Sequence, residues 1–100
     1  MLKKDIIELC LLQLLSGEDM YGYEILRRLH AAFPDTQESA IYSQLRGLCR
    51  QGFTQSYAGQ TSEGPTRKYY RLTPLGQKQL AARLAEWQRL RQTLQDLGIE

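Results

Sequence analysis

One hundred residues, 42% of them hydrophobic, suit one small domain and are too few for several domains. The core of such a domain is too small to make it very stable alone. The formal net charge is only +2, but residues 39–72 carry five basic residues and one acidic residue, a local balance of +4. This basic middle region points to a polyanionic partner only if the five cations share one surface. The apolar stretch 6–15 is too short and too interrupted to span a bilayer, so no membrane association is expected.

The residues that usually carry catalysis or bind metals are scarce. The two cysteines, Cys10 and Cys49, occur without a secretory signal, so we expect reduced thiols in the cytoplasm. The sequence leaves a disulfide between them open. His30 is the only histidine, and it lacks the partner spacing of a catalytic triad or a histidine-rich zinc site. We therefore expect no enzyme activity, no cofactor and no metal.

Two helices are predicted in the first third of the chain. The first, residues 3–15, is apolar on nearly all sides and needs cover from several elements at once. Ser16-Gly17 ends it, and Asp19 is placed to cap the next helix. That second helix, residues 20–32, has apolar residues at three- and four-residue steps and stops at Pro34.

A third helix should start near Asp35 or Thr36, with Glu38 completing a capping box with Asp35, and should end before Gly52. At about 100° per residue, its apolar stripe consists of Ile41, Leu45 and Leu48. Small polar groups and arginines gather on the opposite side: Ser39, Ser43, Arg46 and Arg50. The major groove of DNA accepts such a helix.

A β-hairpin follows. Residues 53–58 alternate as a strand, 59–64 supply a polar turn that ends at the Gly64-Pro65 break, and 67–72 return as the partner strand. A hairpin of this size is stable only when it packs on helices. The second strand can show water a basic edge formed by Arg67, Lys68 and Arg71. Strand parity separates Tyr69 from Tyr70, so only one of them can be buried against the helical body, and the sequence leaves open which one.

The last predicted helix, about 74–97, has Thr73 as its N-cap and Pro74 at its first position. Its apolar residues form a stripe that so small a domain cannot cover: Leu80, Leu84, Trp87, Leu90, Leu94 and Leu97. A second copy of the chain is the simplest cover. We therefore expect a homodimer with these residues at its interface.

Three helices, a small β-hairpin and a long terminal helix describe a mainly α fold, a winged helix-turn-helix with a dimerisation arm. Three stretches also resemble the PadR family of transcriptional regulators: Met20–Ile25, Ser39–Leu45 and Gly64–Gly76. The resemblance covers most of residues 6–76 in the right order and spacing. It departs from the family at Ser43, where Pro is usual, and before Tyr42, where a Gly is frequent. The single terminal helix is similar to the short subfamily.

The resemblance implies a homodimeric repressor of a palindromic, double-stranded DNA operator, with residues 1–73 as the DNA-binding unit and 74–100 as the dimerisation helix. The residues expected near bases or phosphates are Ser39, Tyr42, Ser43, Arg46, Arg50, Arg67 and Lys68. Tyr42 has two interpretations, a core ring and a phosphate donor. Trp87 also has two, because some short members stack a planar, apolar effector between tryptophans at the dimer interface, whereas the alternative is simple packing in the dimer core.

A rival hypothesis belongs to another class of protein. A dimeric winged helix can serve as a protein-interaction or ligand-sensing module without sequence-specific DNA binding. Its third helix would then be expected to expose aromatic or leucine anchors. The predicted outward face offers serines and arginines instead, which favours DNA.

Overall fold

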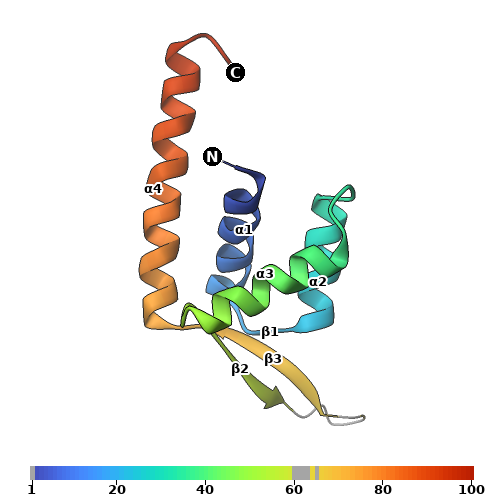
Figure 1. Cartoon of the computed structure of the whole chain (residues 1–100). Coiled ribbons are helices and arrows are strands. Elements are labelled where there is room, and N and C mark those ends of the chain that lie inside the picture. Colours follow the sequence, from blue (N-terminus) through green and yellow to red (C-terminus); the bar gives the residue numbers. More distant parts are fainter. Residues whose placement is uncertain (1, 60–63, 65) are drawn as a thin grey trace.

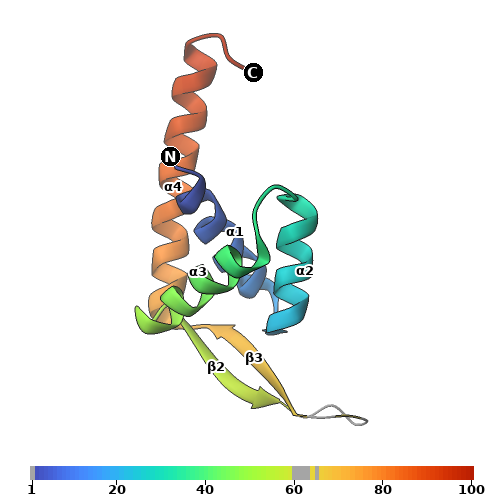
Figure 2. The same cartoon turned by 45° about the vertical axis from the view of Figure 1, so that its right-hand side comes forward.

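The computed structural model describes residues 2–59, 64 and 66–100 (Figure 1). Its elements in chain order are α1 (Lys3–Gly17), β1 (Met20–Tyr21), α2 (Gly22–Ala32), α3 (Glu38–Arg50), β2 (Thr54–Gly59), β3 (Arg67–Leu72) and α4 (Pro74–Asp96). The first three helices form a head, the β2–β3 wing extends from one end of it, and α4 stands beside α1 (Figures 1 and 2). The predicted fold class, mainly α with a small β-hairpin, is confirmed.

Both predicted caps of the middle helices are wrong. Asp19 does not cap α2, because residues 20 and 21 are extended and pair with β3, so that the helix starts only at Gly22. Asp35 does not cap α3, which starts at Glu38 after an N-cap, Gln37, that makes no side-chain hydrogen bond. The chain first closes a turn after α2, in which the amide of residue 36 donates to the carbonyl of residue 33 at 3.0 Å. That turn uses the residues that were expected to begin the helix.

The wing belongs to a three-stranded antiparallel sheet with the order β1-β3-β2. Tyr70 in the central strand pairs with Met20 on one side and Ser56 on the other. Tyr70 is the tyrosine buried against the helices, at 1% exposure, and its neighbour Tyr69 lies on the opposite face, which settles the open alternative. Most of the predicted polar turn at 59–64, together with Pro65, lies outside the described residues.

The hydrophobic core is centred on α1. Leu11 and Leu12 are fully buried, because α2, α3, α4 and β3 all pack around this helix. This arrangement explains why the sequence of α1 is apolar on nearly all sides. The core extends to Leu80 near the start of α4. Cys10 and Cys49 are free thiols, so the structure contains no disulfide between them.

A tight joint connects the wing to α4. The amide of Gly76 donates to the Thr73 hydroxyl at 3.0 Å, which is the predicted N-cap, and that hydroxyl donates to the carbonyl of Gly52 at 2.6 Å. From this joint α4 runs along α1 and then past the end of the head, where no other element lies beside it (Figures 1 and 2). In the described part of the chain, no helix has the length and apolar character needed to cross a membrane.

Candidate nucleic-acid interface

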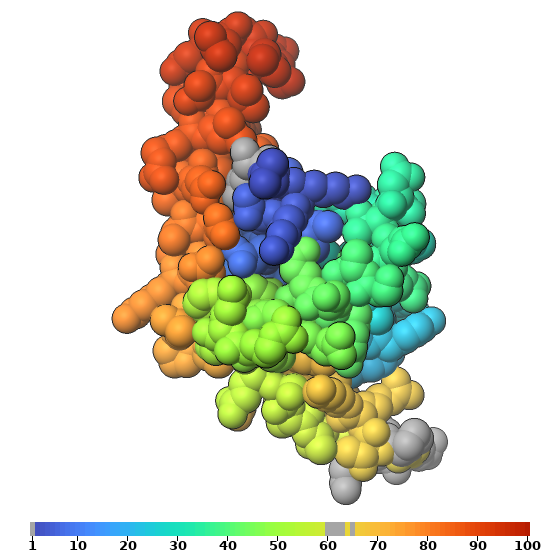
Figure 3. Space-filling model, in the orientation of Figure 1, coloured from blue at the N-terminus to red at the C-terminus, as the bar shows by residue number. Residues whose placement is uncertain are grey.

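The outer surface of α3 is polar and basic, as the helical wheel predicts. Ile41, Leu45 and Leu48 are buried in the core. The residues on the opposite side are all exposed: Ser39, Ser43, Arg46 and Arg50. In the view of Figure 3, α3 lies in green on the near face, directly beside the yellow wing. A duplex laid along α3 can therefore meet the wing as well.

Tyr42 lies at the edge of this surface. Its side chain is half-buried. The guanidinium of Arg46, one turn further along α3, lies 5.3 Å from the centre of the Tyr42 ring. This cation–π contact holds the arginine beside Tyr42 at the surface.

The cations of the wing do not form one edge, so the expectation of a single basic edge is wrong. Lys68 lies on the inner face with Tyr70, and its ammonium is 5.7 Å from the centre of that ring. Arg67 and Arg71 lie on the outer face, because side chains alternate along a strand. Arg67 covers the Tyr21 ring at 4.7 Å, and Arg71 covers the ring of Tyr57 at 5.2 Å.

The outer face of the sheet carries a row of tyrosines. The ring of Tyr69 lies 5.7 Å from that of Tyr57 and 6.0 Å from that of Tyr21. The Tyr57 hydroxyl donates to the Asp19 carboxylate at 2.6 Å, and this hydrogen bond is the main cause that raises the pKa of Tyr57. These aromatic contacts hold the wing against the segment that enters α2.

A hollow at the start of α2 brings three of the predicted contact residues together. Tyr42, Arg67 and Lys68 all line it, although they come from α3 and β3. Ser43 and Arg50 line a different hollow, between α3 and α1, and Ser39 lies at the start of α3. The wing and one edge of α3 thus form a shared site, while the rest of the α3 surface extends away from it.

Sequence reasoning missed two contributors to this site. Tyr70 lines the hollow, and so do the first residues of α2, Gly22 and Tyr23. The available signal was the stretch Tyr21-Gly22-Tyr23, because a helix start without a Ser, Thr, Asp or Asn cap leaves amide hydrogens for another partner.

A polar cluster, missed from the sequence, joins α4 to α1. Arg83 pairs with Glu8, with Asp5 at 3.5 Å and with Glu86 at 3.1 Å. Glu8 also accepts a 3.3 Å hydrogen bond from the side-chain amide of Gln79. The carboxylate of Glu8 is the main cause that raises the pKa of Arg83. Glu8 is itself largely buried, so the cluster fixes α4 against the head. No group of residues suited to a metal ion occurs among the described residues.

The apolar stripe of α4 divides into two parts. Leu80 is 8% exposed and belongs to the core of its own chain, and Leu84 packs against that core. Beyond them, Leu90 and Leu94 are half-buried, while Trp87 and Leu97 are exposed, the latter at 73%. This second part of the stripe is the part that the chain itself leaves uncovered.

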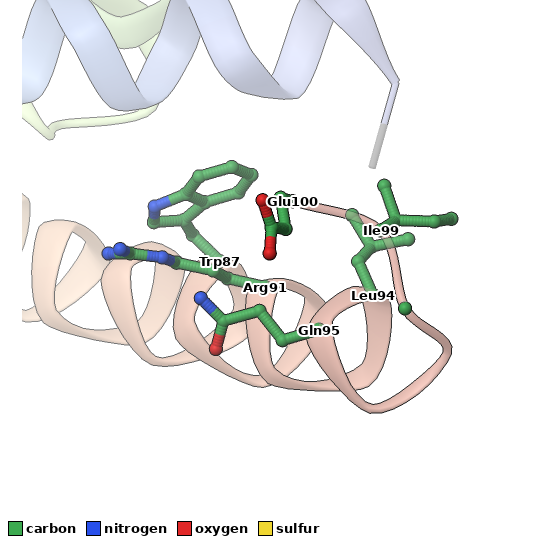
Figure 4. Close-up of a pocket in the computed structure, with 7 residues that line it drawn as sticks. Trp87, Arg91, Leu94, Gln95, Ile99 and Glu100 are labelled. Atoms are coloured by element: carbon green, nitrogen blue, oxygen red, sulfur yellow. The ribbon is translucent and has the colours of Figure 1, made fainter.

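A hollow of ≈ 770 Å³ lies over this second part of α4. Trp87 and Leu94 project from the same side of the helix, and the chain after Gly98 turns back so that Ile99 and Glu100 face them (Figure 4). Arg91 completes a lining that is mainly apolar with one charge of each sign. The sequence indicated only the tryptophan.

Comparison with known proteins identifies the family. Residues 11–82 match the sequence model of the transcriptional regulator PadR-like family. An uncharacterized protein from Lysinibacillus sphaericus is 31% identical, over 100% of this chain and 97% of the relative. A crystal structure of a PadR-like transcriptional regulator from Bacillus cereus is 31% identical, covers 92% of this chain and 90% of that one, and has a TM-score of 0.84.

A PadR family transcription regulator from Clostridium difficile is 27% identical, over 91% of this chain and 96% of that one, with a TM-score of 0.81. The family match runs from the middle of α1, through the α3 surface and the wing, into the first part of α4. The chain therefore belongs to the PadR-like family of transcriptional regulators, which makes it a DNA-binding regulator.

Proposed function

We propose that this regulator is a homodimeric repressor that reads a palindromic operator with α3 and grips the neighbouring backbone with the wing. The observation that carries the proposal is the position of Tyr42, which belongs both to the α3 surface and to the hollow formed with Arg67 and Lys68. One duplex can meet both features. Base contacts then come from α3, and phosphate contacts come from the wing.

The outer face of α3 supports DNA rather than a protein partner. Ser39 and Ser43 let the backbone of a duplex approach closely, and Arg46 can reach a base edge or a phosphate. A protein-docking helix would expose aromatic or leucine anchors. The exposed positions of α3 offer none within the described residues.

The proposed dimer uses the second part of α4. Its apolar residues reach beyond the head of their own chain, and a second copy of the same helix covers them by symmetry. Two heads joined in this way read two half-sites. For a helix-turn-helix dimer these lie about one helical turn apart, roughly 34–36 Å.

The hollow at Trp87 is the proposed effector site. A planar, apolar molecule with a cationic group fits a lining of indole and leucine beside the carboxylate of Glu100. Release of DNA then follows from linkage, because an effector changes DNA affinity only as far as it binds the DNA-competent dimer differently.

The test of DNA reading compares two duplexes, the region upstream of the protein's own coding sequence and a shuffled sequence of equal length. Fluorescence anisotropy at several salt concentrations should give tighter binding to the upstream region at physiological salt. It should also give an affinity that falls steeply with salt, because phosphate contacts release counterions. Equal affinity for both duplexes at physiological salt would contradict specific repression.

The test of the wing uses the same assay with the double change Arg67→Ala/Lys68→Ala. Binding should weaken about equally for all sequences, and the slope of log affinity against log salt should flatten by about four, because each of the two subunits loses two cations. Arg89→Ala removes an exposed charge from α4 and should leave the slope unchanged. An unchanged slope in the wing variant would remove the wing from the proposed interface.

The test of the effector site uses the intrinsic fluorescence of Trp87, the only tryptophan of the chain. A panel of planar cationic dyes should contain members that quench this fluorescence and weaken operator binding in parallel. Trp87→Phe should remove the quenching and reduce dye binding measured by the dye's own emission. If no dye in a diverse panel changes the fluorescence, Trp87 serves packing alone.

A further inference from the structure

The hollow at the start of α2 is lined mainly by four tyrosines and two cations. It has a volume of ≈ 430 Å³ and lies where α2, α3 and β3 meet. A Cβ atom at Gly22 would lie 3.4 Å from the Tyr70 ring and 3.9 Å from the Tyr42 ring. Gly22, the first residue of α2, therefore lies beside both rings.

The start of α2 carries unused positive potential. Its N-cap residue, Tyr21, makes no side-chain capping hydrogen bond. The amide hydrogens of a first helical turn have no partner within the helix, and together with the helix dipole they favour an anion. The one acidic residue of this turn, Glu24, pairs with Arg28 at 3.0 Å along the same helix.

Tyr70 supplies the second, independent indication. It is 1% exposed, it lines the hollow, and its hydroxyl has no hydrogen-bond partner among the described residues. A buried hydroxyl without a partner destabilises the folded chain, so its presence points to a partner that the free protein lacks. Burial, followed by the neighbouring Tyr42, raises the pKa of Tyr70, so the phenol keeps its proton and stays a donor.

Cations surround the same hollow. Lys68 lies over the Tyr70 ring and lines the hollow from the wing. Arg67 lines it from the same strand while it covers Tyr21. Each cation lies over an aromatic ring, which limits its freedom and reduces the entropy lost when it binds an anion.

We propose that this hollow binds one backbone phosphate of the operator. The phosphate contacts the first-turn amides of α2, the hydroxyls of Tyr42 and Tyr70, and the ammonium of Lys68. The inference rests on the proposed function. It adds α2 and Tyr70 to the interface, and it gives the head a fixed register on the duplex, because the contact lies between the groove-reading helix and the wing.

The first experiment replaces single phosphates of the operator by uncharged methylphosphonates. In each half-site, one substitution should weaken wild-type binding by about tenfold, and Lys68→Gln should weaken binding to the unmodified operator by a similar factor. Combined, the two changes should cost little more than either alone. Arg89→Gln removes an equal charge from α4. The loss of affinity that it causes should simply add to the loss caused by each methylphosphonate. If Lys68→Gln is also additive at all positions, the phosphate assignment is wrong.

A second experiment separates a binding role of Tyr70 from a packing role. Tyr70→Phe keeps the buried ring and removes only the unpartnered hydroxyl. Thermal unfolding should occur at the same or a higher temperature, while operator affinity should fall by about three- to tenfold. A variant that binds operator as tightly as the wild type would overturn the role of this hydroxyl, and so would a parallel loss of stability and affinity.

A third experiment tests the hollow without DNA. Titration of the DNA-free protein with inorganic phosphate should shift the amide resonances of Gly22 and Tyr23, and Lys68→Gln should reduce these shifts. Shifts in a protein that binds no specific duplex would support the hollow and contradict the proposed function. Specific DNA binding without amide shifts and without methylphosphonate coupling would overturn the hollow alone.

Discussion

The hydroxyl of Tyr57 in β2 donates a 2.6 Å hydrogen bond to the carboxylate of Asp19. This bond joins the middle of the wing to the segment between α1 and β1, 38 residues earlier in the chain. Arg71 covers the same tyrosine ring, so the bond that positions this ring also helps to position Arg71 on the outer face. The wing is thus held by side chains as well as by its strand pairing.

The bond predicts an alkaline effect on stability. Only the protonated phenol can donate, so the bond to Asp19 raises the pKa of Tyr57 above its ordinary value of 10.0. A folded-state pKa above the unfolded value stabilises the fold fully below pH 10, and this stabilisation is lost as the pH rises through the folded pKa. The unfolding temperature of Tyr57→Phe should therefore be lower than that of the wild type at pH 8, and the two temperatures should converge by pH 12. Tyr23→Phe, which makes the same change at an exposed tyrosine, is the matched control. A constant gap for Tyr57→Phe would contradict the prediction.

Gly76 should tolerate no side chain. A Cβ atom at this position would lie 2.0 Å from the carbonyl oxygen of Phe53 and 2.7 Å from Cδ1 of Leu72. Gly76→Ala must therefore push α4 away from the wing, and we expect a loss of several kcal/mol, beyond the usual range for a point change. Gly17→Ala is the control, because a Cβ at Gly17 meets nothing within 4 Å and alanine favours a helix. Chemical denaturation of both variants measures the difference. Equal stability of the two variants would show that the joint between the wing and α4 can relax around the added methyl group.

The sequence predicted those features that depend on local periodicity. The buried and exposed faces of α3 follow directly from a step of about 100° per residue. The start of α4 was correct to the residue, since Thr73-Pro74 is a strong local signal. β1 was missed because two residues, Met20 and Tyr21, are too few to show an alternation, and their extended form comes from pairing with β3.

The candidate site was predictable only in part, because it too depends on contacts between residues that lie far apart in the chain. Arg67 and Lys68 were found by charge, and alternation along the strand separates them onto two faces. Which of the two faces the helices depends on which tyrosine the head buries. The part played by Tyr70 depends on contacts between β3, α2 and α3, which lie far apart in the chain. The cluster of Arg83 and Glu8 joins residues separated by 75 positions, and no local pattern indicates such a pair.

Arg83 should matter for the attachment of α4 to the head. Arg83→Met leaves the largely buried carboxylate of Glu8 without its cation, and losing one partner of a buried pair costs far more than losing both. Because Arg83 keeps 24% of its side chain exposed, we expect a loss of about 1–3 kcal/mol, below the range for fully buried pairs. The double change Glu8→Leu/Arg83→Met should recover most of it. Urea denaturation measures all three variants, with Arg89→Met as an exposed control. A double variant no more stable than Arg83→Met would contradict this role for the carboxylate.

The two parts of the α4 stripe should respond differently to substitution. Leu90→Lys places a charge on the part that extends beyond the head, so the chain should stay folded and become a monomer, because a lysine cannot be covered by a second helix without loss of hydration. Light scattering should give about half the wild-type mass, with an unchanged circular dichroism spectrum. Leu80→Ala instead opens a cavity in the core of its own chain and should cost about 2–4 kcal/mol of stability without a direct effect on dimerisation. Gln92→Lys, an exposed change on the same helix, controls for the added charge. A Leu90→Lys variant that remains dimeric would place the interface on another surface.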